Sequence, residues 1–137
     1  MTVVINDAVK DAMFRAAKSA LVKAYAPYST TRVAAALLDA AGDIHVGVNV
    51  ENASYGLTIC AERNAIARAI TDGERPFAAI LLISNRGAIP PCGACRQVMQ
   101  EFFRKDDPVF LADESGIKLE YKLADLLPHP FGPPKKK

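Results

Sequence analysis

An unbroken run of seven apolar residues, Phe77 to Ile83, constrains the fold more than any other stretch of this chain. The run is much shorter than the roughly 20 apolar residues that a membrane-spanning helix needs. Its length instead indicates a fully buried strand. Strand and helix patterns alternate around it, which favours a mixed sheet layered with helices. We therefore expect an α/β protein without a membrane partner.

The rest of the chain divides into segments of clear periodicity, in the order α-β-β-α-β-α-β-β-α. The expected helices span 6–24, 60–72, 92–104 and 123–127, and the expected strands span 32–38, 44–50, 77–83, 108–112 and 117–122. Asn6 or Asp7 suits the N-cap of the first helix, and Gly73 suits the end of the second. His45 alternates with Ile44 and Val46 in its strand, so we expect its side chain to face solvent.

Length and charge limit the classes of function that this chain can have. At roughly 100–200 residues per domain, 137 residues predict one domain over 1–131, followed by a Pro/Lys-rich tail over 132–137. The net charge of +2 falls to −1 without Lys135, Lys136 and Lys137, so the body lacks the basic face typical of nucleic-acid binding. The N-terminus has no secretory pattern, and three cysteines make a disulfide framework a poor interpretation. We expect a cytoplasmic protein with reduced thiols.

The three cysteines lie where thiolates are favoured. Cys60 opens the second predicted helix, and Cys92 opens the third, with Cys95 in its first turn. Helix N-termini lower the pKa of a thiol, and three protein ligands with one open position are typical of catalytic zinc. Zinc lowers the pKa of a water in that position to about 7. Glu62, two residues after Cys60, is a carboxylate that can move protons there. We expect one zinc ion per chain.

A zinc ion with three thiolates carries a net charge of −1, which weakens the metal as a Lewis acid unless cations offset it. Arg63 lies three residues after Cys60, and Arg96 lies four residues after Cys92, so both are one helical turn from a ligand. We expect both arginines to tune the charge of the site.

Two other interpretations of the cysteines are weaker. A redox Cys-x-x-Cys pair leaves Cys60 and Glu62 unexplained. A closed structural zinc site needs a fourth ligand, and His45 and His129 are the only histidines in the chain.

Four sequence blocks at these positions resemble the cytidine deaminase family in its small, three-cysteine, homotetrameric form. The blocks are Tyr28-Ser29, VNVENASYGLTICAERNAI over 48–66, PCGACRQVMQEF over 91–102 and LLPHPF over 126–131. The resemblance covers the chain from about Tyr28 to Phe131. It implies a three-layer α-β-α sandwich around a five-stranded mixed sheet. It also implies zinc-dependent deamination of cytidine and deoxycytidine to the uridine products, with release of ammonia, in pyrimidine salvage.

The resemblance further implies a role for each matching residue at the reacting end of the substrate. Cys60, Cys92 and Cys95 bind zinc. Glu62 takes a proton from water, protonates N3 of the pyrimidine and later protonates the departing amine. The backbone N–H of Ala61 donates to the ring carbonyl.

At the sugar end, the resemblance implies that Asn49 and Glu51 hydrogen-bond the ribose hydroxyls. Side chains two residues apart on extended backbone point the same way, which suits that role. By the same resemblance, Ala53, Tyr55 and Phe131 come from neighbouring subunits of a homotetramer and close the pocket.

The chain departs from the family at positions beside the pocket. Thr31, Arg32 and Ala34 stand where the family usually has Phe, Pro and Gly, and Pro90 replaces Ser. The stretch Asn85-Arg86-Gly87 resembles blasticidin-S deaminases instead. These departures leave open a deaminase of N4-substituted cytidines or of blasticidin-like aminonucleosides. An inward Arg32 would favour a polar or anionic substituent on the substrate.

Overall fold

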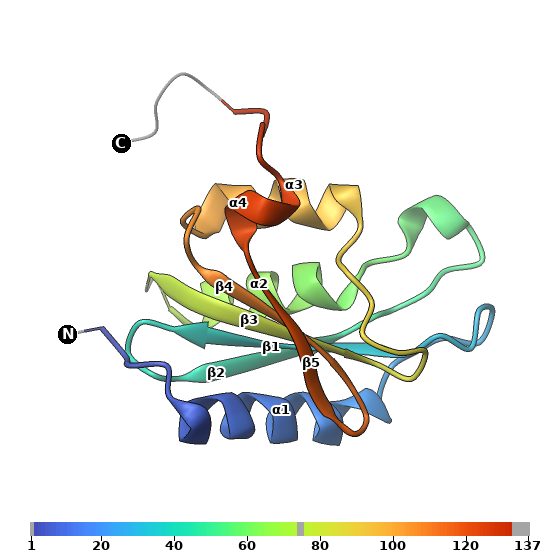
Figure 1. Ribbon diagram of the computed structural model, residues 1–137. Coiled ribbons are helices and arrows are strands. Elements are labelled where there is room, and N and C mark those ends of the chain that lie inside the picture. The colour runs from blue at the N-terminus through green and yellow to red at the C-terminus, as the bar shows by residue number, and fades with distance from the viewer. Residues whose placement is uncertain (1, 74–75, 133–137) are drawn as a thin grey trace.

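Five strands form one mixed sheet in the order β2-β1-β3-β4-β5 in the computed structural model of the chain, which describes residues 2–73 and 76–132 (Figure 1). The strands are β1 (Val33–Asp39), β2 (Ile44–Val48), β3 (Phe77–Ser84), β4 (Pro108–Asp113) and β5 (Gly116–Lys122). Strands β3 and β4 pair in parallel, and the other neighbours in the sheet pair antiparallel. Most of the predicted Pro/Lys tail, residues 133–137, lies outside the described residues.

The helices are α1 (Asp7–Leu21), α2 (Ala61–Asp72), α3 (Gly93–Phe102) and α4 (Leu123–Leu126), with a 3-10 turn, η1, at Tyr55–Leu57. The Asn6 side chain caps α1 by accepting from the N–H of Val9 at 2.9 Å. Helix α1 ends three residues earlier than its periodicity predicts because the chain turns to pair Tyr25 with Val50. No sequence pattern predicted η1.

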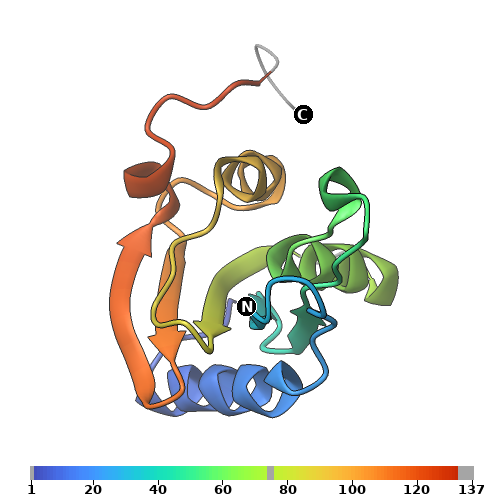
Figure 2. The same ribbon diagram turned by 90° about the vertical axis from the view of Figure 1, so that its right-hand side faces the viewer.

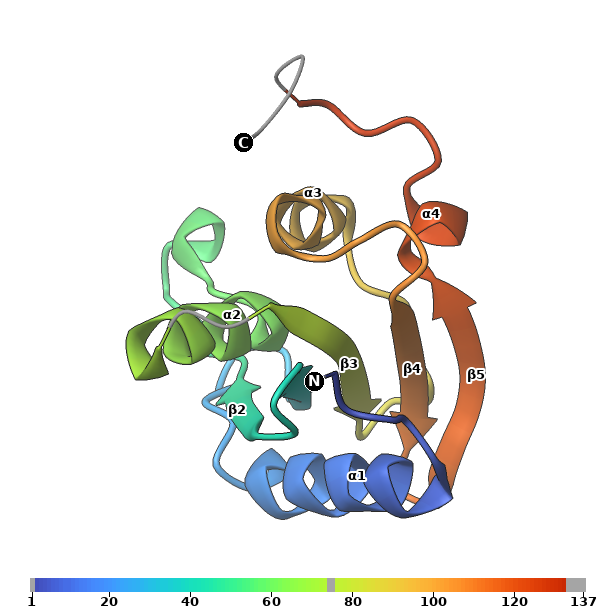
Figure 3. The ribbon, with the colours of Figure 1, turned by 90° about the vertical axis from the view of Figure 1, so that its left-hand side faces the viewer.

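The sheet lies between two helical layers, with α1 on one face and α2, α3 and α4 on the other (Figure 3). Along each central strand, alternate side chains pack into two separate hydrophobic cores, one on each face of the sheet. Ile80 and Leu82 of β3 pack beneath α2 and α3, whereas Leu81 and Ile83 pack against α1. All eight residues of β3 are buried, as the apolar run predicts. The expected three-layer sandwich around a five-stranded mixed sheet is confirmed.

None of the helices formed by residues 2–73 and 76–132 has the length and apolar character that crossing a membrane requires.

The prediction that His45 faces solvent is wrong. His45 is 8% exposed, and its ring lies between two carboxylates. Nδ1 is 2.8 Å from an oxygen of Asp72 at the end of α2, and Nε2 is 2.9 Å from an oxygen of Asp39 in β1. Strand β2 lies at the edge of the sheet, yet α1 covers one of its faces and α2 covers the other. The polar residue of the alternation is therefore buried with partners rather than solvated.

The His45 cluster makes stability depend on pH. Burial disfavours the imidazolium, but the hydrogen bonds and attraction from Asp39 and Asp72 outweigh it and raise the pKa of His45. A raised folded-state pKa adds stability below the unfolded value of about 6.5, and this contribution is lost as pH rises through the folded value. We expect His45→Gln to lower the free energy of unfolding by about 1–3 kcal/mol at pH 6 and by less at pH 9. Urea unfolding of both proteins with excess zinc measures this; equal losses at the two pH values contradict it.

Candidate metal centre and active site

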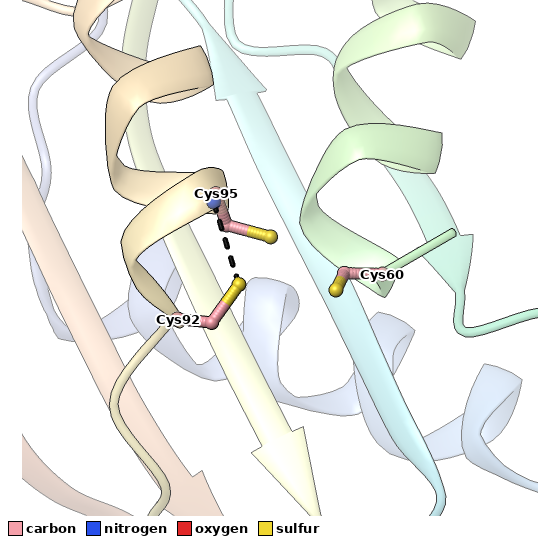
Figure 4. A group of neighbouring side chains, drawn as sticks. All are labelled: Cys60, Cys92 and Cys95. Atoms are coloured by element: carbon pink, nitrogen blue, oxygen red, sulfur yellow. Dashed lines mark hydrogen bonds between the residues drawn. The ribbon is translucent and has the colours of Figure 1, made fainter. Parts of the chain in front are cut away.

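The sulfurs of Cys60, Cys92 and Cys95 form one cluster, within 4.8 Å of one another (Figure 4). Cys60 is the N-cap of α2 and Cys92 is the N-cap of α3, where the Cys92 sulfur also accepts from the N–H of Cys95 at 3.4 Å. The packing of α2 beside α3 brings their N-termini together, and the predicted three-cysteine cluster forms there.

The cluster fits a zinc ion. Four-coordinate zinc about 2.3 Å from each sulfur separates the sulfurs by about 3.8 Å, a spacing the cluster reaches with small side-chain shifts. The described residues place only these three ligand groups together, which leaves one coordination position for a non-protein ligand. Neither histidine joins the cluster, so the closed structural site is not supported.

The pKa values of Cys60 and Cys95 shift in opposite directions because the two thiols are hydrogen-bonded to each other. Because the Cys95 thiol donates to the Cys60 sulfur and the Arg63 guanidinium lies nearby, the pKa of Cys60 falls to about 5 despite its partial burial. The same hydrogen bond, together with burial, raises the pKa of Cys95. Metal ligands bind as thiolates, so metal binding here releases a proton.

The two arginines predicted to tune the charge are placed differently. One nitrogen of Arg63 is 3.6 Å from the Cys60 sulfur and 3.5 Å from the carbonyl of Thr58. Arg96 instead donates to the carbonyls of Pro91, at 2.7 Å, and Leu126, at 2.8 Å. Its charge therefore lies against the turn before α3 rather than against a sulfur.

Glu62 is buried beside the cluster, with 5% exposure. Burial, reinforced by the neighbouring Cys60 thiolate, raises its pKa. The raised pKa makes the protonated form of this carboxyl easier to reach, and general acid–base chemistry needs both protonation states.

A cavity of about 200 Å³ opens over this group. Its polar lining consists of Asn49, Cys60, Glu62, Cys92 and Thr58. Ala61, the first residue of α2, also lines it, and an N–H at that position has no acceptor within the helix. The apolar walls come from Val33, Leu82, Ile89 and Pro90.

A second cavity, of about 320 Å³, adjoins the first at Thr58 and contains Glu51. The backbone N–H groups of Tyr28 and Ser29 donate to one oxygen of Glu51 at 3.0 and 3.2 Å, and the Ser29 hydroxyl donates to the other. These hydrogen bonds lower the pKa of Glu51 and hold its carboxylate in one orientation. Sequence reasoning gave Tyr28 and Ser29 no role, because a contact across more than 20 residues between two loops has no periodic signal.

The Asn49 side chain is hydrogen-bonded to the backbone at the start of β1 and just before it. Its side-chain oxygen accepts from the N–H of Val33 at 2.9 Å, and its amide nitrogen donates to the carbonyl of Thr31 at 2.8 Å. One amide hydrogen remains for a ligand in the cavity that it lines.

Three other predicted site residues lie on exposed loops. Ala53 is exposed, Tyr55 is 74% exposed with its ring 5.9 Å from that of Tyr28, and Phe131 is 83% exposed. The segment after α4 runs away from the sheet (Figure 2). The side-chain amide of Gln97 donates to the Phe131 carbonyl at 2.7 Å.

An inward Arg32 is not supported. Its guanidinium donates at 3.0 Å to the carbonyl of Val22, the C-cap of α1, where a cation is favourable. Neither cavity has Arg32 or Thr31 among its described lining residues.

Comparisons with known proteins agree with this geometry. Residues 8–111 match the family model described as "Cytidine and deoxycytidylate deaminase zinc-binding region". A cytidine deaminase of Halalkalibacterium halodurans is 47% identical over 109 residues, which are 79% of this chain and 83% of that protein. The crystal structure of cytidine deaminase from Burkholderia pseudomallei has a TM-score of 0.82 and 47% identity, covering 88% of this chain and 98% of that one. The cytidine deaminase structure from Mycobacterium tuberculosis has a TM-score of 0.78 and 33% identity, covering 93% and 99%.

We expect purified protein to contain about one zinc ion per chain, because the described residues form one three-thiol cluster. Cys92→Ala removes a ligand and should lose the metal. His129→Ala changes an exposed residue outside the cluster and should keep it. Elemental analysis after dialysis measures both variants; zinc retained by Cys92→Ala, or lost from His129→Ala, contradicts the three-cysteine site.

Proposed function

The chain belongs to the cytidine and deoxycytidylate deaminase family with its zinc-binding region, and from this premise we propose that it is a zinc-dependent nucleoside deaminase. The proposed reaction hydrolyses cytidine or deoxycytidine to uridine or deoxyuridine and releases ammonia, as in cytoplasmic pyrimidine salvage. One observation carries the proposal: the clustered thiols of Cys60 and Cys92 line one cavity together with the buried carboxyl of Glu62.

The metal would be held by Cys60, Cys92 and Cys95. Bound zinc supplies Lewis-acid activation of a water molecule. Arg63, beside the Cys60 sulfur, offsets part of the negative charge of three thiolates. Arg96 supports the site indirectly, since it holds the carbonyl that precedes Cys92.

Glu62 moves the protons in this proposal. Its carboxylate takes a proton from the attacking water and delivers one to N3 of the ring. After attack at C4 it takes the second proton from the new C4 hydroxyl and passes it to the departing amine, so that the water oxygen becomes the 4-carbonyl and ammonia leaves. The raised pKa of Glu62 supports these alternating roles, because the carboxyl must be an acceptor at one step and a donor at the next.

The remaining predicted substrate contacts lie along the two cavities, from the metal cluster to Glu51. The free N–H of Ala61 donates to the ring carbonyl of the pyrimidine. Asn49, in the inner cavity, and Glu51, in the outer one, bind the ribose hydroxyls. Glu51 suits a hydroxyl donor because its carboxylate is ionised and already oriented by three hydrogen bonds.

We further propose a homotetramer whose subunits share pocket residues. Tyr55, Leu57 and Phe131 are each at least 66% exposed, an unusual state for large apolar side chains at the mouth of a site. A neighbouring subunit would bury them, and Ala53, Tyr55 and Phe131 would then close the pocket of that neighbour.

Cytidine and deoxycytidine remain the preferred substrates over N4-substituted cytidines and blasticidin-like aminonucleosides. The alternative depended on changes at Thr31 and Arg32, which line neither cavity, and on the stretch Asn85-Arg86-Gly87. The blasticidin-S deaminases that this stretch resembles lack the ribose-binding pair that this chain has as Asn49 and Glu51. No polynucleotide or membrane partner is proposed. Uridine formation across a panel of these nucleosides tests the assignment, and a preference for a substituted substrate over cytidine overturns it.

Glu62→Gln should abolish turnover while keeping the metal. The substitution preserves shape but removes the group that moves protons, and such groups contribute about 10²–10⁴-fold. Because Glu62 serves several steps, we expect a loss in kcat at or beyond the upper end of that range, with zinc content unchanged. Glu114→Gln, in the exposed turn between β4 and β5, is the matched control and should keep full activity. Near-normal turnover by Glu62→Gln shows that another base operates.

Shared pockets predict complementation between inactive variants. A mixture of Glu62→Gln and Phe131→Ala, co-expressed so that the subunits exchange, should regain activity at sites that receive Glu62 from one chain and Phe131 from another. A mixture of Glu62→Gln and Cys92→Ala should regain little, because both changes damage the metal end of the same chain. Equal behaviour of the two mixtures, or an active monomer in sedimentation, contradicts the shared pocket.

A further inference from the structure

The loop between α1 and β1 adopts a strained conformation where it holds Glu51. Tyr28 and Ser29 supply the three donors to that carboxylate. The next residue, Thr30, has a φ of 58°, the one positive value among described residues other than glycine. A β-branched residue disfavours this left-handed region. The loop therefore depends on contacts from elsewhere to keep its shape.

Asn85, the first residue after β3, supplies three of those contacts. Its side-chain nitrogen donates to the carbonyl of Thr30 at 3.0 Å, and its side-chain oxygen accepts from the N–H of Arg32 at 2.9 Å. Its own N–H donates to the carbonyl of Arg32 at 3.2 Å. Asn85 thus extends the pairing of β1 with β3 and fixes the backbone on both sides of Thr31.

Arg86 supplies two further contacts to this loop. Its guanidinium donates to the hydroxyl oxygen of Thr30 at 2.7 Å and to the carbonyl of Ser29 at 3.4 Å. One side chain therefore binds both the strained residue and the residue that carries the hydroxyl donor to Glu51.

We propose that Asn85 and Arg86 are positioning residues for the sugar end of the substrate: they hold the Ser29–Thr30 loop, which orients the Glu51 carboxylate toward a ribose hydroxyl. The inference rests on the proposed function, since it assigns the sugar to Glu51. Neither side chain is among the described lining residues of the two cavities of the site, so both act through the loop.

This pair also links the two ends of the site. Asn85 and Arg86 begin the segment that runs from β3 to α3, and Cys92 ends it. One segment therefore ends at a clustered thiol, Cys92, and also holds the loop that fixes Glu51. The pair sets the distance from the metal end to the sugar hydroxyls, and it favours nucleosides over substrates that lack those hydroxyls.

The test compares cytidine with 2′,3′-dideoxycytidine, which lacks both hydroxyls. Asn85→Asp keeps the acceptor for Arg32 but loses the donor to Thr30, and Arg86→Ala loses both of its contacts. For each variant we expect kcat/KM for cytidine to fall about tenfold, mainly through KM, with a much smaller change for dideoxycytidine. The ratio between the two nucleosides should approach that of Glu51→Ala. Arg86→Lys, which keeps a cationic donor, should retain more of the ratio, and Arg68→Ala, an exposed arginine on α2, should leave it unchanged.

Hydrogen exchange tests the same loop without any substrate. The amides of Tyr28 and Ser29 should exchange faster in Asn85→Asp and Arg86→Ala than in the wild type, while β3 keeps its protection. If the wild type deaminates no cytosine nucleoside, the proposed function fails, and the exchange result still decides whether the pair holds the loop. Equal losses for cytidine and dideoxycytidine, or unchanged exchange at both amides, overturn the inference.

Discussion

The closeness of α2 to the sheet is the constraint on which the site depends. At Gly47, in β2, a Cβ atom would lie 2.3 Å from the backbone nitrogen of Ala65 and 2.7 Å from the carbonyl oxygen of Ala61. Only hydrogen fits there, and the facing residues of α2 are buried alanines. This contact sets how far the first turn of α2 stands from the sheet, and Cys60 caps that turn. A larger residue would lift the helix and move its sulfur away from the two on α3.

Much of the fold could be predicted because each helix and strand carries its own period and end signals. The N-caps Asn6, Cys60 and Cys92 lie where the sequence places them. The failures occur where tertiary contacts decide. The period of β2 shows that its faces differ, but it cannot show that α2 covers the face with His45. The Ser29–Glu51 contact joins two loops, and loops carry no period from which pairing can be read.

The candidate site, too, could be predicted only in part from the sequence. The Cys-x-x-C spacing puts Cys92 and Cys95 on one helical turn, but only the packing of α2 beside α3 adds Cys60. At the start of α2, burial and charge shift the pKa values of Glu62 and Cys60 in opposite directions. Glu62 is buried and its pKa rises, whereas Cys60 accepts from the Cys95 thiol, lies beside Arg63, and its pKa falls. Opposite shifts within one turn are typical of functional sites, because one group must stay anionic while its neighbour exchanges protons.

The metal end and the sugar end of the site are built from different kinds of structural element, and the proposed chemistry explains the difference. The metal end uses helix N-termini together with the buried side chains of Glu62 and Cys95, which hold donors in fixed positions where charge develops during reaction. The sugar end uses exposed loops, a common place for recognition. Exposed loops are mobile unless something holds them, and here the structure offers two devices. Asn85 and Arg86 bind the loop beside Glu51 from within the chain, and the exposed rings of Tyr55 and Phe131 offer apolar surface to another subunit. Accuracy at the sugar end would thus come from contacts added to loops, rather than from the packed core that fixes the metal end.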